Sequence, residues 1–195
     1  MYFITYDTPK IGTVSFIHKV QIQSGQTVLI HGATGAIGSA LLQFVRLFDV
    51  TITATCSAKN MELVKTLRAD KVLDYTKEDF TEGQDTYNFI FDSVGKSTFG
   101  KCKSVLKEKG TYISSELGLY SQNLWYAALS SISRGKKVIF PVPYSKQKTI
   151  PYIMQMLEEG HFAPVIDREY ALEDISKAYE YVLTGEKTGN VIINL

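Results

Sequence analysis

The chain alternates short apolar runs with longer segments in which apolar residues recur at helical spacing. The first run, 27–30, ends at a polar residue and a glycine and predicts a buried strand. Residues 36–48 follow and are mainly apolar, apart from a narrow polar stripe formed by Ser39, Gln43 and Arg46. This pattern predicts a helix that is buried over most of its circumference.

The same alternation continues to the end of the chain. Runs rich in β-branched or aromatic residues predict strands at 50–55, 71–74, 88–92, 111–114, 136–140 and 191–193. Helical spacing predicts helices at 60–67, from Phe99 through Leu106, and around 121–133, 150–159 and 173–184. Pro151 is expected in the first turn of its helix, and Gly185 is expected to end the last helix. The alternation predicts an α/β fold, a doubly wound, mostly parallel sheet with helices on both faces.

Composition narrows the functional classes without naming one. Lysine and arginine number 21 against 20 aspartates and glutamates, and the net charge of +1 argues against a nucleic-acid partner. The most apolar stretch, 124–129, is too short to span a bilayer, so no membrane partner is expected. Two cysteines do not make a disulfide framework and no secretory leader pattern opens the chain, so a reducing, cytoplasmic location is expected.

A glycine-rich loop lies between the first predicted strand and the first predicted helix. Residues 31–38 read H-G-A-T-G-A-I-G, a variant of G-x-G-x-x-G in which Ala33 takes the first glycine position. Glycines at this place permit a tight turn and a close approach of the backbone, while the helix N-terminus attracts phosphate charge. The loop therefore predicts binding of a dinucleotide pyrophosphate. The alternative is a purely structural turn.

The segment after the second predicted strand indicates which nucleotide is bound. NAD-binding sites place an Asp or Glu about 20 residues after the glycine loop. Residues 53–61 contain no carboxylate and instead offer the donors Ser57, Lys59 and Asn60, which suit a 2′-phosphate. NADP (NADPH) is therefore the expected cofactor. In the alternative, Ser57 only caps a helix and Lys59 is only solvated.

Several stretches together carry a family resemblance. They are residues 25–38, the L-x-A-D-x-V-x-D-Y pattern at 67–75, and residues 91–95, 160–167 and 189–194. In this order they resemble the cofactor-binding Rossmann domain of the medium-chain dehydrogenase/reductase superfamily, in its zinc-independent quinone oxidoreductase-like branch. The resemblance implies hydride transfer from NADPH to a carbonyl, enone or quinone substrate. It also implies a homodimer formed through the sheet edge near 136–140.

The resemblance further implies which residues bind the cofactor. The pyrophosphate group comprises Thr34, Gly35, Ala36 and Ile37. The group around the adenosine 2′-phosphate comprises Ser57, Lys59, Asn60 and Tyr75. The group beside the ribose and nicotinamide comprises Ser93, Val94, Gly95 and Leu117. Alternatives remain for two residues, because Tyr75 could cover a strand end and Val94 could be a core residue.

The sequence departs from the family pattern in three places. Asp49 and Arg68 stand where the family usually has glycine, and we expect only local changes in these turns. Residues 1–24 have no clear period and are expected to form an appendage, with residues 25–195 forming the NADP-binding domain. The catalytic domain that family members carry before this one is largely missing. We therefore expect a truncated product or a stand-alone module that is not fully active, and we assign no catalytic residue.

Other chemistries fit the sequence less well. His18, His31 and His161 are dispersed and no C-x-x-C pair is present, so no zinc site is expected. Tyr144 and Lys148 match the Y-x-x-x-K pattern of short-chain dehydrogenases. Prolines precede that pair and the predicted helix begins after it, which argues against one shared helical face. A non-catalytic NADPH-binding module is the remaining alternative.

Overall fold

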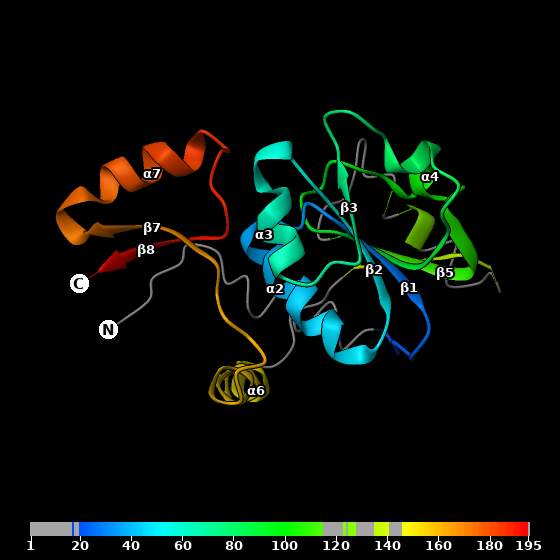
Figure 1. Cartoon of the computed structure of the whole chain (residues 1–195), viewed down its shortest axis with the longest axis horizontal. Helices are drawn as coiled ribbons and strands as arrows, with labels where there is room; N and C mark the ends of the chain where they lie inside the picture. Colours follow the sequence, from blue (N-terminus) through cyan, green and yellow to red (C-terminus); the bar gives the residue numbers. More distant parts are fainter. Residues whose placement is uncertain are drawn as a thin grey trace.

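In the computed structural model, six parallel strands form a sheet in the order β3-β2-β1-β4-β5-β6 (Figure 1). The structure describes residue 17 and residues 20–114, 123, 125–127, 135–140 and 146–194. The strands are β1 (Thr27–His31), β2 (Thr51–Cys56), β3 (Lys71–Asp74), β4 (Tyr87–Asp92), β5 (Leu106–Ser114) and β6 (Lys137–Ile139). The strand order reverses between β1 and β4, which confirms the predicted doubly wound sheet.

Helices connect these strands. They are α2 (Ala36–Val45), α3 (Met61–Thr66), α4 (Phe99–Cys102) and α6 (Lys146–Glu158), with short 3₁₀ turns at Arg46–Phe48, Ala58–Asn60 and Phe80–Glu82. Residues 123 and 125–127 are helical and fall within the predicted helix 121–133, whose other residues lie outside the described ones. Within the described part of the chain, no helix has the length and apolarity needed to cross a membrane.

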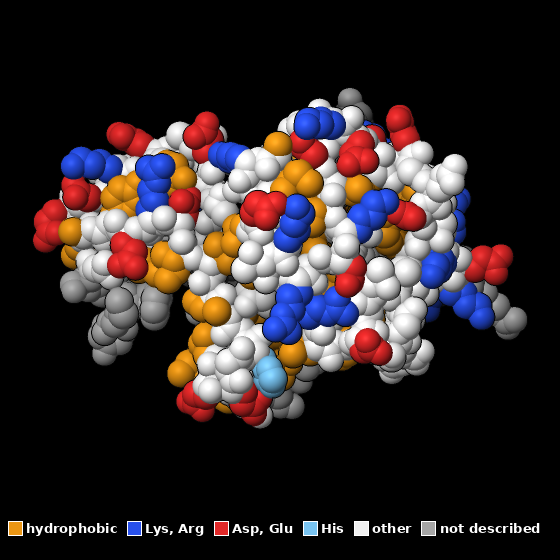
Figure 2. Space-filling model, in the orientation of Figure 1, with side chains coloured by type: hydrophobic (Ala, Val, Ile, Leu, Met, Phe, Trp, Pro, Cys, Tyr) orange, Lys and Arg blue, Asp and Glu red, His pale blue; other side chains and the backbone are white. Residues whose placement is uncertain are grey.

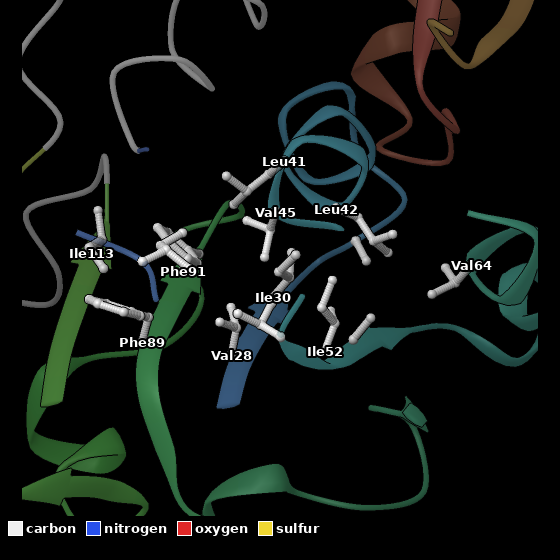
Figure 3. Packing of buried hydrophobic residues seen from close by; sticks show 14 of the residues in the cluster. Val28, Ile30, Leu41, Leu42, Val45, Ile52, Val64, Phe89, Phe91 and Ile113 are labelled. Carbon is white, nitrogen blue, oxygen red and sulfur yellow. The ribbon is translucent and has the colours of Figure 1, made fainter. Parts of the chain in front are cut away.

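Alternate residues of each strand pack into different layers. Val28 and Ile30 of β1 belong to a buried cluster with Leu41 and Val45 of α2 (Figure 3). Leu29, between them in sequence, belongs to the cluster on the α4 side. Buried strand residues therefore contribute to clusters on both faces, as expected for a parallel sheet that is covered on both faces.

The packing of α6 against α2 explains why α2 is so apolar. On the side away from the sheet, Ala40 and Phe44 of α2 pack against Ile153 and Met156 of α6 and against Phe162. The Phe44 and Phe162 rings are stacked with centroids 5.0 Å apart. This packing confirms the prediction that α2 is buried over most of its circumference.

The structure corrects the prediction of one helix from Phe99 through Leu106. The helix α4 ends at Cys102, and Leu106 is the first residue of β5, where it is paired with Tyr87. Phe99, Cys102 and Leu106 all reach the same buried cluster. Their helical spacing therefore reflects a shared burial site and not a continuous helix.

The position of Pro151 is also corrected. The helix α6 begins at Lys146, so Pro151 lies inside the helix and not in its first turn. Residues 146–149 read K-Q-K-T and lack the apolar period that marked the rest of the helix. Their helical structure could not be predicted from periodicity alone.

The last part of the chain forms a separate unit of β7 (Ile166–Ala171), a 3₁₀ turn (Leu172–Asp174), α7 (Ile175–Leu183) and β8 (Asn190–Asn194). The strands β7 and β8 pair with each other in parallel and do not join the six-stranded sheet. Figure 1 shows this C-terminal unit beside α2 and α3. The sequence predicted α7 and β8, and Gly185 follows α7 with a φ of 72°, as expected. The sequence did not predict β7.

Both residues that replace a family glycine adopt a left-handed backbone conformation. Asp49 has a φ of 39° and Arg68 a φ of 71°. After α3, the Arg68 amide donates to the Lys65 carbonyl at 2.8 Å and the Ala69 amide donates to the Val64 carbonyl at 3.3 Å. This is the hydrogen-bond pattern of a Schellman motif, in which glycine is the preferred residue at the position of Arg68. The turn is therefore kept although the glycine is not.

Candidate functional site

The glycine loop connects β1 to α2, at the point where the strand order reverses. A Cβ on Gly32 would lie 2.4 Å from a methyl group of Val94, and Gly32 has a φ of 80°. A Cβ on Gly38 would lie 2.2 Å from the Gly32 carbonyl oxygen. A larger residue at Gly32 would have to displace the Val94 side chain and adopt a strained φ, and one at Gly38 would collide with the backbone of the loop.

The N-terminus of α2 has the properties of an anion site. Gly35 is its N-cap residue, makes no side-chain cap, and is followed by a first turn without acidic residues. The first-turn amides of a helix have no partners within the helix, and its dipole adds positive potential there. A phosphate group fits this site in both charge and hydrogen-bonding capacity.

The loop after β4 is fixed against the glycine loop by hydrogen bonds. The Ser93 hydroxyl donates to the His31 carbonyl at 2.7 Å, and the Ser93 amide donates to the same oxygen at 3.1 Å. Val94 is 42% exposed, so it is not a core residue, and Gly95 follows it with a φ of 68°. The structure therefore brings 93–95 next to 32–35, as the cofactor hypothesis requires.

A fully buried carboxylate organises the β4 loop. Asp92 accepts hydrogen bonds from the amides of Val94 at 3.2 Å, Gly95 at 2.9 Å and Ser97 at 3.1 Å. It also accepts from the Tyr112 hydroxyl at 2.9 Å. Burial and the neighbouring Asp92 raise the pKa of Tyr112 well above its usual value, so this hydroxyl stays a donor. Sequence reasoning did not assign Asp92 a role, although an acidic residue at the end of a buried strand was the available signal.

His31 and Thr55 connect the glycine loop to β2. Thr55 Oγ1 accepts from the Gly32 amide at 3.1 Å and lies 2.8 Å from His31 Nδ1. The Thr55 hydroxyl therefore links the Gly32 amide to the His31 ring. Burial lowers the pKa of His31, against the raising influence of Asp92 and Asp79. His31 is therefore a structural residue of the loop in its neutral form.

The predicted 2′-phosphate group lies after β2 and β3. The Ser57 side chain makes no capping bond to the 3₁₀ turn that it precedes, which speaks against a pure capping role. Asn60 Nδ2 lies 3.5 Å from the Ser57 hydroxyl, and Lys59 is exposed. Tyr75 is 54% exposed, and its amide donates to the Cys56 carbonyl at 3.1 Å. These residues thus share one edge of the sheet with the glycine loop.

Sequence reasoning missed a contact with the C-terminal unit. The Gly189 amide donates to the Thr34 carbonyl at 2.7 Å, and Gly189 forms an isolated parallel bridge with Gly35. Asn60 Nδ2 donates to the Thr188 hydroxyl at 3.3 Å. The segment 189–194 carried part of the family resemblance, yet a resemblance does not show which residues it touches.

Two of the predicted residues lie outside the described part of the chain, and a third lies on a described helix. Leu117 and Tyr144 lie outside them, so their placement stays a prediction. Lys148 lies on α6, which begins at Lys146. The argument that the helix starts after the Tyr144–Lys148 pair is therefore wrong for Lys148, because the polar first turn hid the true start of the helix.

Side chains that could bind a metal ion are scattered over the described part of the chain. Among the residues that the structure describes, no three His, Cys, Asp or Glu side chains gather as metal ligands. Both cysteines are buried and free, and burial raises the pKa of the Cys56 thiol to about 11 and that of Cys102 to about 12. Zinc prefers thiolates and neutral imidazoles, so these residues do not fit a zinc ion.

Comparison with known proteins adds independent evidence on the family of this chain. The sequence model of the family described as zinc-binding dehydrogenase matches residues 67–193. The 2-methylene-furan-3-one reductase of Solanum lycopersicum is 30% identical over 182 residues, covering 91% of this chain and 42% of that protein. The chloroplastic NADPH-dependent alkenal/one oxidoreductase of Arabidopsis thaliana is 26% identical over 179 residues, covering 90% of this chain and 42% of that protein.

A solved structure gives the same picture of the fold. The quinone oxidoreductase from Coxiella burnetii has a TM-score of 0.85 and 21% identity, covering 96% of this chain and 58% of that one. At this identity the likeness supports the fold alone. The chain spans about half the length of the curated relatives that it matches.

Proposed function

The chain belongs to the zinc-binding dehydrogenase family of the medium-chain dehydrogenase/reductase superfamily, and from this membership we propose that it binds NADPH for an oxidoreductase. The substrate class that we propose is a quinone, an enone or another carbonyl compound. The relatives named above act on a furanone and on alkenals and alkenones, by their names. A bound nicotinamide would supply the hydride.

One observation carries the proposal. The N-terminus of α2, whose N-cap residue Gly35 brings no side chain, lies at the reversal point of the sheet, and its first turn contains no acidic side chain. Ligands of open α/β sheets bind at this point, outside the carboxyl ends of the strands. We assign the pyrophosphate to the backbone of Thr34, Gly35, Ala36 and Ile37.

The polar residues after β2 support NADPH in preference to NADH. Ser57, Lys59 and Asn60 are donors, and no carboxylate lies in the segment 53–61. Asp74, which is paired in register with Cys56, is buried and accepts from the amide and hydroxyl of Thr76. Its Oδ1 atom is therefore engaged locally, and its Oδ2 atom lies 3.9 Å from the Lys77 ammonium. We assign the 2′-phosphate to Ser57, Lys59, Asn60 and Tyr75.

The remaining assignments complete the proposal. Ser93, Val94 and Gly95 would border the ribose and nicotinamide, where the hydrogen bonds of Asp92 hold the loop rigid. We propose that the enzyme is of the zinc-independent type that the sequence resembles, which is consistent with the lack of a cluster of metal-ligating side chains among the described residues. We also propose a cytoplasmic location. We further propose a homodimer in which a second copy extends the sheet from β6, the last strand in the order of the sheet.

Ligand-dependent stability tests the proposed function. The chain is unfolded thermally without ligand and with NADPH, NADH or free nicotinamide at matched concentrations. A ligand at a hundred times its Kd should stabilise the fold by about 2.7 kcal/mol. We expect stabilisation by both dinucleotides, larger with NADPH, and none with nicotinamide. An equal or larger shift with NADH would contradict the 2′-phosphate assignment, and no shift with either would contradict the function.

A further inference from the structure

A cavity lies at the end of α2 that is remote from the glycine loop. Its volume is about 310 Å³, near the lower limit of the range of about 300–1,000 Å³ that small-molecule sites occupy. Its walls come from the end of α2 and the turn after it (43–47), the end of α3 (66–68) and the segment after α6 (160–161). The ten residues of α2, at about 1.5 Å each, place the cavity about 15 Å from the proposed pyrophosphate position. The two places are therefore separate.

The charged side chains that line the cavity are basic. Arg46, Arg68 and His161 come one from each of the three segments, and no acidic residue is among the described residues of the lining. We call this site the basic cavity. Leu47 and Leu67 add apolar surface, and Leu47 is 43% exposed. The lining therefore combines positive charge with an apolar patch, a combination that suits an organic anion.

Neighbouring residues hold Arg46 in place. Its Nη1 atom donates to Asp70 Oδ2 at 2.8 Å, and its Nη2 atom donates to the Val50 carbonyl at 2.5 Å. A guanidinium has five N–H donors, so these two bonds leave others for a ligand. The ion pair with Asp70 balances the charge of Arg46 and fixes its planar group at the cavity wall.

Arg68 differs from Arg46 because its charge is not balanced. Among the described residues, no carboxylate forms an ion pair with Arg68, and its side chain is exposed. Its backbone has a φ of 71°, a conformation that glycine adopts without the cost that a side chain brings. Strained residues of this kind gather at ligand sites. An arginine at a position that favours glycine therefore points to a role for the guanidinium.

The dipole of α3 offers a competing explanation for Arg68. A basic side chain at a helix C-terminus is stabilising, because the free carbonyls there leave negative potential. At the end of α3, however, the Lys65 carbonyl accepts from the Arg68 amide and the Val64 carbonyl accepts from the Ala69 amide. The helix has only six residues, and these bonds leave little negative potential for Arg68 to balance.

The third wall of the basic cavity is fixed by Gln43. Its Nε2 atom donates to the Ala163 carbonyl at 3.0 Å, and its Oε1 atom accepts from the Ala163 amide at 2.9 Å. On the other side of His161, its own amide donates to the Met156 carbonyl at 2.9 Å. The His161 imidazole is exposed, with Nε2 at 3.7 Å from Glu159 Oε2. Bonds on both sides of His161 therefore shape this wall before any ligand binds.

We propose that the basic cavity binds a small phosphate monoester, with its phosphate on Arg68 and Arg46 and its organic group against Leu47 and Leu67. Guanidinium groups match phosphate oxygens in paired hydrogen bonds. A phosphate monoester carries a charge of about −1.5 to −2 at neutral pH and has three strong acceptor oxygens. It can therefore accept from both guanidiniums and from His161 at once. The inference goes beyond the proposed dinucleotide function and does not depend on it.

The first experiment titrates phenyl phosphate, benzoate and benzyl alcohol into the ¹⁵N-labelled chain and follows the amide signals. We expect phenyl phosphate to shift the signals of 66–68 and 160–161 to saturation, with a lower Kd than benzoate. Benzyl alcohol, which has no charge, should leave these signals unmoved. The signals of 35–37 report separately on the glycine loop, where a phosphate could also bind.

The second experiment repeats the titration with variants of Arg68. Arg68→Gly removes the guanidinium and keeps the turn, whereas Arg68→Ala removes it and keeps the strained backbone. Both should raise the Kd of phenyl phosphate about tenfold or more, because a charged hydrogen-bond partner is lost. Arg68→Lys should restore part of the affinity. Lys65→Ala is the matched control and should bind like the wild type, since Lys65 lies on the same helix and pairs with Glu62 at 2.7 Å.

The outcomes separate this site from the dinucleotide site. Unchanged binding of phenyl phosphate by Arg68→Gly overturns the inference, and so does an equal loss in Lys65→Ala, which would show a general effect of charge. Shifts confined to 35–37, or no shifts at all, overturn it as well. Benzoate that binds as tightly as phenyl phosphate overturns the assignment to a phosphate. Failure of the chain to bind NADPH overturns the proposed function and leaves the basic cavity unaffected.

Discussion

At the scale of single residues, the candidate site depends on side chains that hold the loops in place. Thr55 joins the Gly32 amide to the His31 ring, and Asp92 gathers the amides of the β4 loop. These residues would not touch a bound dinucleotide by the present assignment. They fix the backbone that would, which is why sequence motifs built on cofactor contacts did not reveal them.

The half-buried imidazole of His31 predicts a pH dependence of stability. Burial lowers the pKa of His31 below its ordinary value of 6.5. The unfolded chain therefore binds more protons than the folded one in weak acid, and the free energy of unfolding should fall as the pH drops below about 6.5. Above that pH the contribution of His31 is fully present.

Denaturant unfolding at pH 7.5, 6.5 and 5.5 checks this expectation. The wild type should lose stability across the series, and His31→Gln should lose less, even if its stability at pH 7.5 is lower. Asp74 and Asp79 also have lowered pKa values, caused mainly by hydrogen bonds from Thr76 and Thr81. Their stabilising contributions are lost only in stronger acid. Parallel curves for wild type and variant would contradict the role of His31.

Lys59 carries the prediction on cofactor choice. Lys59→Glu places a negative charge in the proposed 2′-phosphate group, so NADPH should bind at least about tenfold more weakly while NADH changes little. Isothermal titration with both dinucleotides measures the ratio. Lys177→Glu is the matched control because it changes the same charge on α7. Equal losses for NADPH and NADH would show that Lys59 does not distinguish them.

The Asp92 carboxylate predicts a large effect on stability. Asp92→Asn should lower the free energy of unfolding by about 2–4 kcal/mol, because an amide NH₂ would face donors in a buried place. Tyr112→Phe removes only one of the donors and should cost less. Chemical denaturation of both variants gives the order. A smaller loss for Asp92→Asn than for Tyr112→Phe would contradict the role assigned to this carboxylate.

At the scale of elements, two helices end in the same motif with different residues. After α6 the Gly160 amide donates to Leu157 and the His161 amide donates to Met156, at 3.2 and 2.9 Å. This matches the end of α3, where Arg68 takes the place of the glycine. A left-handed conformation costs a residue with a side chain about 1 kcal/mol or more.

The end of α3 therefore offers a stabilising substitution. Arg68→Gly should raise the free energy of unfolding by about 0.5–1 kcal/mol, after the greater flexibility of glycine in the unfolded chain is counted. Arg68→Ala is the control, because it removes the side chain and keeps the strained backbone. Thermal and denaturant unfolding compare the three proteins. A gain for Arg68→Ala equal to that of Arg68→Gly would show that strain is not the cause.

Elements with a strong local pattern could be predicted from the sequence. The runs that became β1 to β4 are short and rich in β-branched, aromatic or other apolar residues, and α2 meets apolar partners on two sides, so their patterns were clear. Long-range contacts decided the others. Leu106 joins the α4 cluster from a strand, and β7 is polar and exposed along most of its length, so neither had a usable period.

The same distinction applies to the candidate site. The glycine loop could be predicted because a local turn needs local glycines. The contact between Thr34 and Gly189 could not, since these residues are far apart in the sequence and only the fold brings them together. Asp92 and Thr55 were missed for a related reason, as their partners lie on other loops and strands.

At the scale of the whole molecule, the surface combines interspersed charges with exposed apolar residues on the C-terminal unit. Charged side chains of both signs are interspersed over the face in Figure 2, in keeping with the net charge of +1. The C-terminal unit also exposes large apolar residues, namely Ile166, Leu172, Ile175, Tyr179 and Leu183. Among the described strands, β7 and β8 pair with each other, and the segment before β8 reaches the candidate site through the bond from the Gly189 amide to the Thr34 carbonyl. Cofactor binding and the placement of the C-terminal unit should therefore be coupled.

The most direct test of the account is a crystal structure of the chain with NADPH bound. We expect the pyrophosphate oxygens within hydrogen-bond distance of the first-turn amides of α2, with the adenosine 2′-phosphate beside Ser57, Lys59 and Asn60. A dinucleotide bound elsewhere on the molecule, or a structure in which a side chain of the protein fills the N-terminus of α2, would contradict the account.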